Sequence, residues 1–154
     1  MKKIFLFFVY MFLLVNPAFS AEWVRINNDT YIDLSSIKIF IENDVPNFDC
    51  RVFWVKQYNN GQFSSFDITK EETGKDITYS LVQYIVNISE KQLALNEIIH
   101  YDEKFNVVAS WHRYNKPVWT SIPPESYGEM LYYSIKNKRK LTRLYKEQQQ
   151  LDVK

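Results

Sequence analysis

The chain has 154 residues, of which 46% are hydrophobic, 24% are charged and only 3 are glycine. This composition fits one folded domain and excludes a disordered or low-complexity chain. The formal net charge of +1 conceals an asymmetry, because residues 21–135 carry 10 basic and 16 acidic side chains whereas residues 136–154 carry 7 basic and 2 acidic.

The first twenty residues are typical of a secretory signal peptide. Lys2 and Lys3 precede an uninterrupted apolar run of 12 residues at 4–15, and a small-x-small triplet at 18–20 ends directly before Ala21. A membrane-spanning helix needs about 20 apolar residues, so this run is too short to span a bilayer. We therefore predict cleavage after residue 20 and an exported protein with no transmembrane segment, in the periplasm, secreted or at the cell surface. No cysteine lies near the cleavage site, so we expect no lipoprotein.

The first half of the mature chain is rich in short segments with strand character. β-Branched and aromatic residues alternate with polar ones and are bounded by Asn, Asp and Ser clusters, which is typical of strands joined by turns. We predict a loop at 43–47 and a long exposed connection at 59–76, with one irregular strand around 63–68. The predicted strands cover residues 22–26, 30–33, 37–41 and 51–58.

Three longer strands follow and predict an antiparallel meander. The turn between the last two, residues 102–106, contains Asn106, which we expect to adopt the left-handed conformation that tight turns require. The three strands cover residues 77–88, 92–101 and 107–114.

A helix follows the meander. Pro124 favours a first helical turn, and Ser126 with Glu129 three residues later matches a capping box, so we predict a start at 124–126. The apolar stripe predicts packing on the sheet, giving an α+β fold of about six antiparallel strands with one C-terminal helix. Residues 136–154 form a basic tail, either disordered or a helical extension that runs into solvent. The stripe consists of Tyr127, Met130, Leu131, Ser134 and Ile135.

The sequence contains no recognisable catalytic or metal-binding pattern. His100 and His112 are the only histidines, and the predicted hairpin does not place them opposite each other. No nucleophile elbow, P-loop or dinucleotide-binding motif is present. We therefore predict no enzyme, no catalytic residue, no metal and no cofactor. The single cysteine, Cys50, is either a buried or half-buried inert thiol or the site of an intermolecular disulfide that would make a dimer.

The basic tail is the candidate partner-binding site. In an exported protein, nucleic acid is a poor partner, whereas an extracellular or envelope protein, an anionic glycan or an acidic membrane surface suits a basic run. The alternative is that these cations only complement the C-terminal end of the helix dipole. The candidate residues are Lys136, Lys138, Arg139, Lys140, Arg143 and Lys146.

Several short motifs, taken in order, carry a family resemblance. They are Tyr31-Ile32-Asp33 with Ser36-Ile37, Gln83-Tyr84-Ile85-Val86-Asn87, Tyr101-Asp102, and Trp119-Thr120-Ser121-Ile122-Pro123-Pro124-Glu125-Ser126 before Glu129 and Leu131. Over residues 23–135 the mature chain resembles the bacterial surface-adhesin protein E-like family. The resemblance implies a bent antiparallel sheet with a C-terminal helix across it. It also implies export in a bacterium with an outer membrane and the binding of host proteins.

The chain departs from that family in two respects. Family members often join the middle strand to the final helix by a disulfide, but here those places hold Ile88 or Ser89 and Ser134 or Ile135. We expect apolar packing in place of the bridge. The adhesin also carries a lipid anchor, which we do not expect here because no cysteine lies near the predicted cleavage site.

Two functional hypotheses remain open. The first is an exported, non-enzymatic binding domain for a host or envelope protein or an anionic glycan. The second is a small periplasmic hydrolase or ligand carrier that uses a cleft between the sheet and the helix. A flat, aromatic-rich exposed face would favour the first, and an apolar pocket with convergent polar groups would favour the second.

Overall fold

A computed structural model describes residues 21–59, 64–114 and 116–152, so the predicted signal peptide lies outside the described residues. The described chain consists mainly of β-strands and ends in two helices. In chain order the elements are β1 (Trp23–Arg25), β2 (Thr30–Asp33), the 3-10 helix η1 (Leu34–Ser36), β3 (Lys38–Glu42), β4 (Val45–Tyr58), α2 (Ser64–Thr73), β5 (Tyr79–Asn87), β6 (Gln92–Tyr101), β7 (Val107–His112), β8 (Thr120–Ser121), α3 (Tyr127–Lys136) and α4 (Lys138–Asp152).

The strands form one antiparallel 8-stranded sheet with the order β1-β2-β4-β5-β6-β7. Two strands lie off this path, because β3 pairs with β4 and β8 pairs with β6. The predicted α+β class and the predicted meander of β5, β6 and β7 are confirmed. Strand β4 is longer than expected, since it begins at Val45 directly after a two-residue turn. Both turn residues, Asn43 and Asp44, have positive φ, so the predicted loop at 43–47 is wrong.

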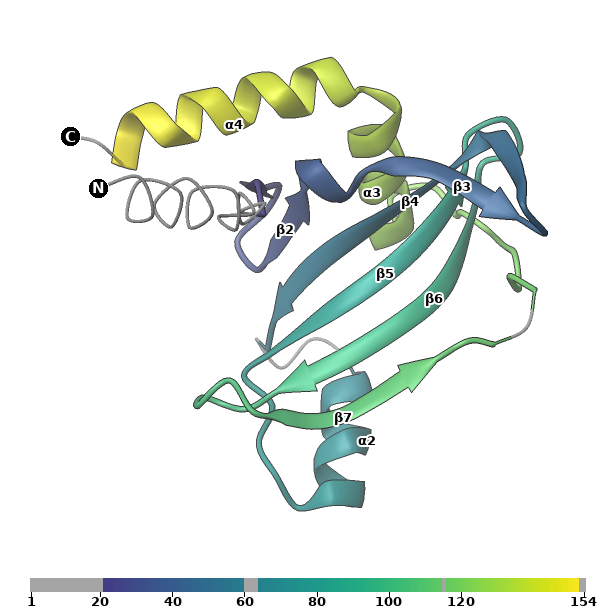
Figure 1. Cartoon of the computed structure of the whole chain (residues 1–154). Helices are drawn as coiled ribbons and strands as arrows, with labels where there is room; N and C mark the ends of the chain where they lie inside the picture. Colours follow the sequence, from purple (N-terminus) through teal and green to yellow (C-terminus); the bar gives the residue numbers. More distant parts are fainter. Residues whose placement is uncertain (1–20, 60–63, 115, 153–154) are drawn as a thin grey trace, which may run out of the picture.

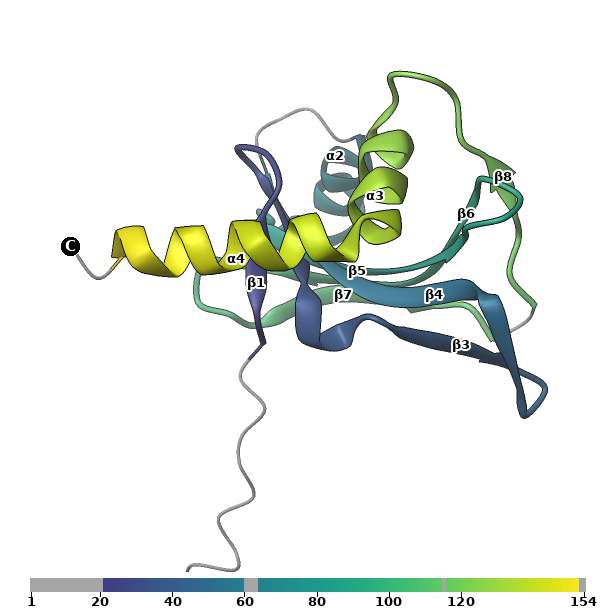
Figure 2. The same cartoon turned by 90° about the horizontal axis from the view of Figure 1, so that it is seen from above.

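The two faces of the sheet differ in what covers them. Helices α2 and α3 lie behind the sheet in Figure 1 and on one side of it in Figure 2, and we call this side the helix face. Helix α4 runs past the β1 edge of the sheet. We call the other side the open face, because no helix of the described chain packs on it. The sheet therefore has one face covered by helices and one face that no described helix covers.

The main core lies on the helix face. Strand residues Ile32, Phe53 and Val55 are completely buried, and from α3 Leu131 and Ile135 pack against them. Alternation along β4 turns Phe53 and Val55 to this side, and the helical stripe predicted for α3 meets them. Burial of each such side chain stabilises the fold by about 1.5–3 kcal/mol.

A second, smaller core occupies part of the open face. Cys50, Ile85 and Ala94 are buried there, with Phe40 of β3 and Trp119 packed over them. Cys50 is fully buried, so the interpretation as a buried thiol is confirmed. Burial raises the pKa of the Cys50 thiol, with the carboxylates of Asp49 and Glu42 acting in the same direction.

The C-terminal segment forms two helices instead of one. Ser126 caps α3 as predicted, since its Oγ accepts a hydrogen bond from the Glu129 amide at 3.2 Å. The first helix ends at Lys136 with Asn137 as its C-cap, and α4 then packs against β1 with Leu141 buried in the main core. The prediction that the extension runs into solvent is therefore wrong, because an apolar side of α4 completes the core.

Two further local predictions are wrong. Residues 64–73 form α2, where we expected an exposed connection with an irregular strand. In the turn between β6 and β7, Phe105 adopts the positive φ expected of Asn106. Asn106 instead donates a backbone hydrogen bond to the Asp102 carboxylate at 2.8 Å, so the Asp102 side chain organises this turn.

Apolar packing joins β5 to α3 where the family resemblance implies a disulfide. Ile88 packs against the main core that contains the buried Ile135. The hydroxyl of Tyr132 on α3 also donates a hydrogen bond to the carbonyl of Ile88 at 3.0 Å. Side-chain packing and one hydrogen bond therefore fix the helix to the strand.

Candidate functional site

A row of tyrosine rings crosses the open face. Tyr31 and Tyr58 have ring centroids 5.8 Å apart, Tyr58 and Tyr79 5.9 Å, and Tyr79 and Tyr101 4.8 Å with nearly parallel planes. We call these four residues the tyrosine strip. Aromatic pairs at such separations stabilise one another by about 0.5–1.5 kcal/mol beyond their area burial. The strip is thus a preorganised surface feature.

The strip results from strand register. Tyr58 of β4 pairs with Tyr79 of β5, and Tyr79 pairs with Tyr101 of β6, so the three rings stand in one cross-strand row. Tyr31 on β2 pairs with Lys56, two residues before Tyr58 on the same side of β4. Because Val55 points to the helix face, this alternation places the strip on the open face.

Lys56 is the cation next to the strip. Its ammonium lies 4.7 Å from the ring centroid of Trp23 and 5.4 Å from that of Tyr79. Burial lowers the pKa of Lys56, and no carboxylate of the described residues forms an ion pair with it. Cation–π contacts therefore hold this ammonium beside the tyrosine strip without neutralising it.

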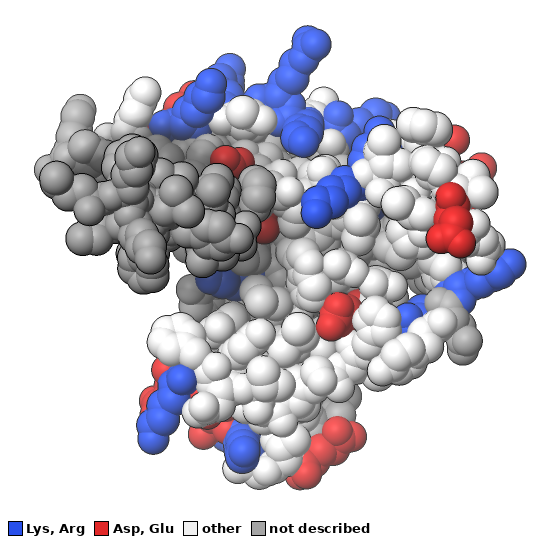
Figure 3. Space-filling view, viewed as in Figure 1, with Lys and Arg blue, Asp and Glu red and all other residues white. Residues whose placement is uncertain are grey.

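The strip lies in a weakly charged part of the surface. Figure 3 shows the open face from the viewpoint of Figure 1, and its middle is mostly free of Lys, Arg, Asp and Glu. Tyr58 is 39% exposed and Phe105, whose ring lies 6.3 Å from Tyr79, is 75% exposed. This half of the open face therefore offers aromatic groups to solvent, whereas the other half is covered by the second core.

The predicted basic residues gather at another part of the molecule. They lie along the exposed side of α4 and its junction with α3, at the top of Figure 3. Lys138, Arg139 and Lys140 fall in the first turn of α4, where the helix dipole disfavours cations. The helix-dipole explanation therefore fails for these three, although Lys136 does end α3. We call the six residues the basic cluster: Lys136, Lys138, Arg139, Lys140, Arg143 and Lys146.

Few carboxylates neutralise the basic cluster. Arg143 forms an ion pair with Glu147 at 3.4 Å, and Lys136 donates a hydrogen bond to the Tyr132 hydroxyl at 3.1 Å. Within the described residues, no other member has an ion-pair partner. The sequence proposed these six residues as candidates, and the structure places all six on the end of α3 and on α4.

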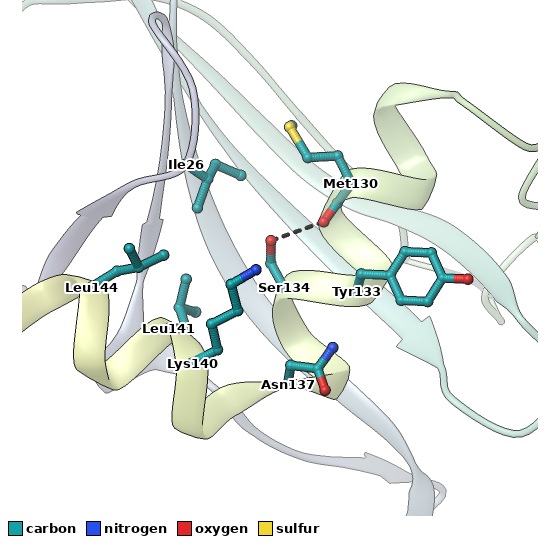
Figure 4. Close-up of a pocket in the computed structure, with 8 residues that line it drawn as sticks. All are labelled: Ile26, Met130, Tyr133, Ser134, Asn137, Lys140, Leu141 and Leu144. Atoms are coloured by element: carbon teal, nitrogen blue, oxygen red, sulfur yellow. Dashed lines mark hydrogen bonds between the residues drawn. The ribbon is translucent and has the colours of Figure 1, made fainter.

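A groove between α3 and α4 borders the basic cluster. It has a volume of about 270 Å³ and Figure 4 shows its walls. Lys140 reaches across the groove, with its ammonium toward Ser134. The groove is thus apolar at its floor and cationic at its rim. Its lining residues are Ile26, Met130, Tyr133, Ser134, Asn137, Lys140, Leu141 and Leu144.

A second cavity lies between the sheet and the helices, where a ligand cleft was one hypothesis. It measures about 180 Å³ and combines polar groups with apolar walls. Burial raises the pKa of the Tyr127 hydroxyl, aided by Tyr84 and opposed by hydrogen bonds with Thr30 and Gln57. The lining residues are Gln57, Ser80, Val82, Tyr84, Leu95, Ile98, His100 and Tyr127.

A serine–histidine pair lies in this cavity. Ser80 Oγ and His100 Nδ1 are hydrogen-bonded at 2.5 Å, and burial lowers the pKa of His100. Both side chains are buried, and the ring of Phe66 from α2 packs edge-on against the imidazole. No carboxylate of the described chain is hydrogen-bonded to His100. Within the described residues this pair has no orienting acid of the kind found in a hydrolytic triad, and its hydrogen bond satisfies two buried polar atoms.

His112 lies apart from His100, and the two histidines do not form a common site. His112 pairs with Glu97 in the sheet and lies 3.5 Å from its carboxylate, well away from His100 on the opposite face. No group of three or more His, Cys, Asp or Glu residues in the described ranges could hold a metal ion. Of the helices described, none is long and apolar enough to cross a membrane.

Known structures share this architecture. A crystal structure of protein E from non-typeable Haemophilus influenzae matches with a TM-score of 0.51 and 18% identity, covering 88% of this chain and 95% of that one. A second crystal form of Haemophilus influenzae protein E matches with a TM-score of 0.50 and 18% identity, covering 75% of this chain and 87% of that one. The chain therefore has a protein E-like fold. No protein-family model and no curated protein matches the sequence.

Proposed function

We propose that this chain with a protein E-like fold is an exported, non-enzymatic binding domain whose partner is a host or envelope protein. The observation that carries the proposal is the tyrosine strip on the open face of the sheet. Protein interfaces are enriched in Tyr and Trp, because these side chains supply large contact areas at a small cost in conformational entropy.

Ring orientation supports a protein partner over a stacked sugar. Tyr79 and Tyr101 are stacked on each other with an interplanar angle of 7°. The two ring faces that stack on each other are therefore closed to a sugar. Hydroxyl groups next to apolar carbon suit the mixed polar and apolar surface of a protein.

The basic cluster has a different role in this proposal. Exposed charges at the rim of an interface change association rates and salt dependence more than they change the lifetime of a complex. The cluster therefore steers an acidic partner toward the domain, and the tyrosine strip holds it. The candidate residues predicted from sequence thus act through long-range attraction.

The test compares two variants with a matched control. Tyr58→Ser/Tyr101→Ser should weaken binding to immobilised extracellular-matrix or envelope proteins at every salt concentration, because it removes contacts. Lys138→Gln/Arg139→Gln/Lys140→Gln should slow association only at low salt, because about 0.5 M salt screens exposed charges. The control Tyr114→Ser removes a tyrosine that is 91% exposed outside the strip and should leave binding unchanged.

Two outcomes would contradict this proposal. If the strip variant binds as well as the control variant, the open face is not the binding surface. If heparin-like glycans bind and no protein does, with the charge variant losing all binding, the partner is an anionic glycan and the basic cluster is the site.

The sheet–helix cavity supports a second candidate, a small-ligand carrier. Its apolar walls and convergent hydroxyl groups match the general character of ligand sites, although about 180 Å³ is below their usual ~300–1,000 Å³. Native mass spectrometry of protein from its own host would detect a retained ligand. Val82→Trp should abolish that ligand without affecting partner capture, since Val82 lines the cavity.

Export is tested separately. Intact mass of the protein recovered from its native host should match a chain that begins at Ala21 and carries no acyl group. A mass that corresponds to the uncut precursor, or to a lipidated chain, would contradict the proposed processing.

A further inference from the structure

The β3–β4 hairpin exposes an unusual amount of apolar surface. Ile41 is 61% exposed and Phe48 is 71% exposed, and Ile39 lies two residues before Ile41 on the same side of β3. The segment 39–50 contains three acidic residues and no basic one. We call this segment the hairpin tip. Exposed apolar groups rimmed by polar residues are typical of an interaction site. The three carboxylates here outnumber the one neighbouring cation, Arg51, whose guanidinium donates a hydrogen bond to the Phe48 carbonyl at 2.7 Å.

The groove between α3 and α4 has the complementary character. Its floor contains Met130, Leu141 and Leu144, and Lys140 spans its mouth. The segment 130–146 contains six basic residues and no acidic one. A cavity of about 150 Å³ accommodates a benzene ring, so a groove of about 270 Å³ has room for a phenylalanine side chain.

We infer that the hairpin tip of one copy docks into the α3–α4 groove of a second copy. Phe48 enters the apolar floor, and the carboxylates of Glu42 and Asp44 meet the ammonium groups of Lys138 and Lys140. Each copy exposes one acidic apolar projection and one basic apolar groove, and charge complementarity selects this pairing over contact between two like surfaces.

The contact is intermolecular because of where the two surfaces lie. The groove lies between α3 and α4. Figures 1 and 2 both show the β3–β4 hairpin projecting from one end of the sheet, apart from the α3–α4 junction. When only one tip of a pair is docked, the pair keeps one free tip and one free groove, so further copies can add head to tail. Association therefore grows with concentration instead of stopping at a dimer.

Sedimentation velocity of the mature chain tests the inference. At about 100 μM, a range suited to small interfaces, the average mass should exceed that of a monomer. It should fall toward the monomer when salt rises from about 50 mM to about 500 mM, because the pairing is charge-assisted. A monomer at about 100 μM in low salt would overturn the inference.

Two one-sided variants identify the surfaces. Ile41→Ser/Phe48→Ser removes the apolar tip. Lys138→Glu/Lys140→Glu reverses the charge of Lys140 at the groove rim and of Lys138 in the adjoining turn of α4. Each alone should weaken self-association about tenfold or more, equal to a loss of about 1.4 kcal/mol. The control Val118→Ser/Leu151→Ser changes exposed apolar residues outside both surfaces and should associate like the unmodified chain.

Mixing the two variants is the decisive step. One retains a working groove and the other a working tip, so an equimolar mixture should form one-to-one pairs and no longer species. An interface in which a tip meets a tip, or a groove meets a groove, would give no such rescue. A mixture that forms no pairs would therefore overturn the inference. Tyr58→Ser/Tyr101→Ser should leave self-association unchanged, which separates this result from the proposed partner binding.

Discussion

Leu141 on α4 offers the sharpest test of the core described here. It is only 2% exposed and packs in the main core, although we predicted from the sequence that this helix would run into solvent. Leu141→Ala loses about 2 kcal/mol of transfer free energy, and each 40 Å³ of cavity left unfilled adds about 1 kcal/mol. Because α4 lies at the edge of the core and can relax inward, we expect a total near 2–3 kcal/mol.

The assay is urea unfolding monitored by tryptophan fluorescence, with thermal melts as a second measurement. A loss of 2–3 kcal/mol corresponds to a fall of about 10 °C in Tm for a chain of this size. The matched control is Leu151→Ala on the same helix, where the side chain is 72% exposed and the expected loss is below about 0.5 kcal/mol. Equal losses in the two variants would refute the packing of α4. For the same reason, truncation after residue 137 should destabilise the fold.

Three other predictions follow from single residues. Ser126→Ala should cost about 1 kcal/mol in urea unfolding and Ser126→Gly rather less, because Ser126 caps α3 through the Glu129 amide; an unchanged midpoint would show that the cap is redundant. Burial lowers the pKa of His100 from its ordinary 6.5, so the unfolded state takes up the proton first. The contribution of neutral His100 to the free energy of unfolding should therefore be fully present above pH 6.5 and should decline as the pH falls below it. Urea melts between about pH 7.5 and pH 5 should show a smaller decline in the free energy of unfolding for His100→Gln. Cys50 should not react with a thiol reagent in the native protein and should react fully in urea, because it is buried with a raised pKa; rapid native labelling would contradict the burial.

Much of the sheet was predictable because its signals are local. Strands β2 and β6 begin and end at the predicted residues, since alternating apolar side chains and turn residues bound them directly. The Ser126 cap was also readable, because Ser126 and Glu129 stand at the spacing that a capping box requires. In each case the determinants lie within a few residues of the structure that they specify.

Helix α2 was missed because its β-branched and polar residues show no clear apolar period. A usable signal was present at Gly74, which has a φ of +67° and whose amide hydrogen-bonds to the carbonyl of Lys70. A glycine in this left-handed conformation is typical of the residue after a helix C-terminus. The break at Asn137 lacks such a signal, so one helix was expected where two form.

The candidate surfaces differ in the same way. The basic cluster follows from charge counts, so Lys138, Arg139 and Lys140 could be proposed as candidates from the sequence alone. The tyrosine strip depends on the register that aligns Tyr58, Tyr79 and Tyr101 across three strands. A shift by one residue in either pairing would move a ring to the helix face, so this surface could not be read without the sheet.

The non-covalent contact between Ile88 and α3 determines the redox conditions under which this protein can fold. Tyr132 and Ile135 hold the helix against the strand without any covalent bond, and Cys50 is the sole thiol of the chain. Reaching the native state therefore requires no oxidant and no disulfide isomerase. The chain can therefore fold equally well in the reducing cytosol of an expression host or in an oxidising envelope. Added reductant should not destabilise it, because there is no disulfide to reduce.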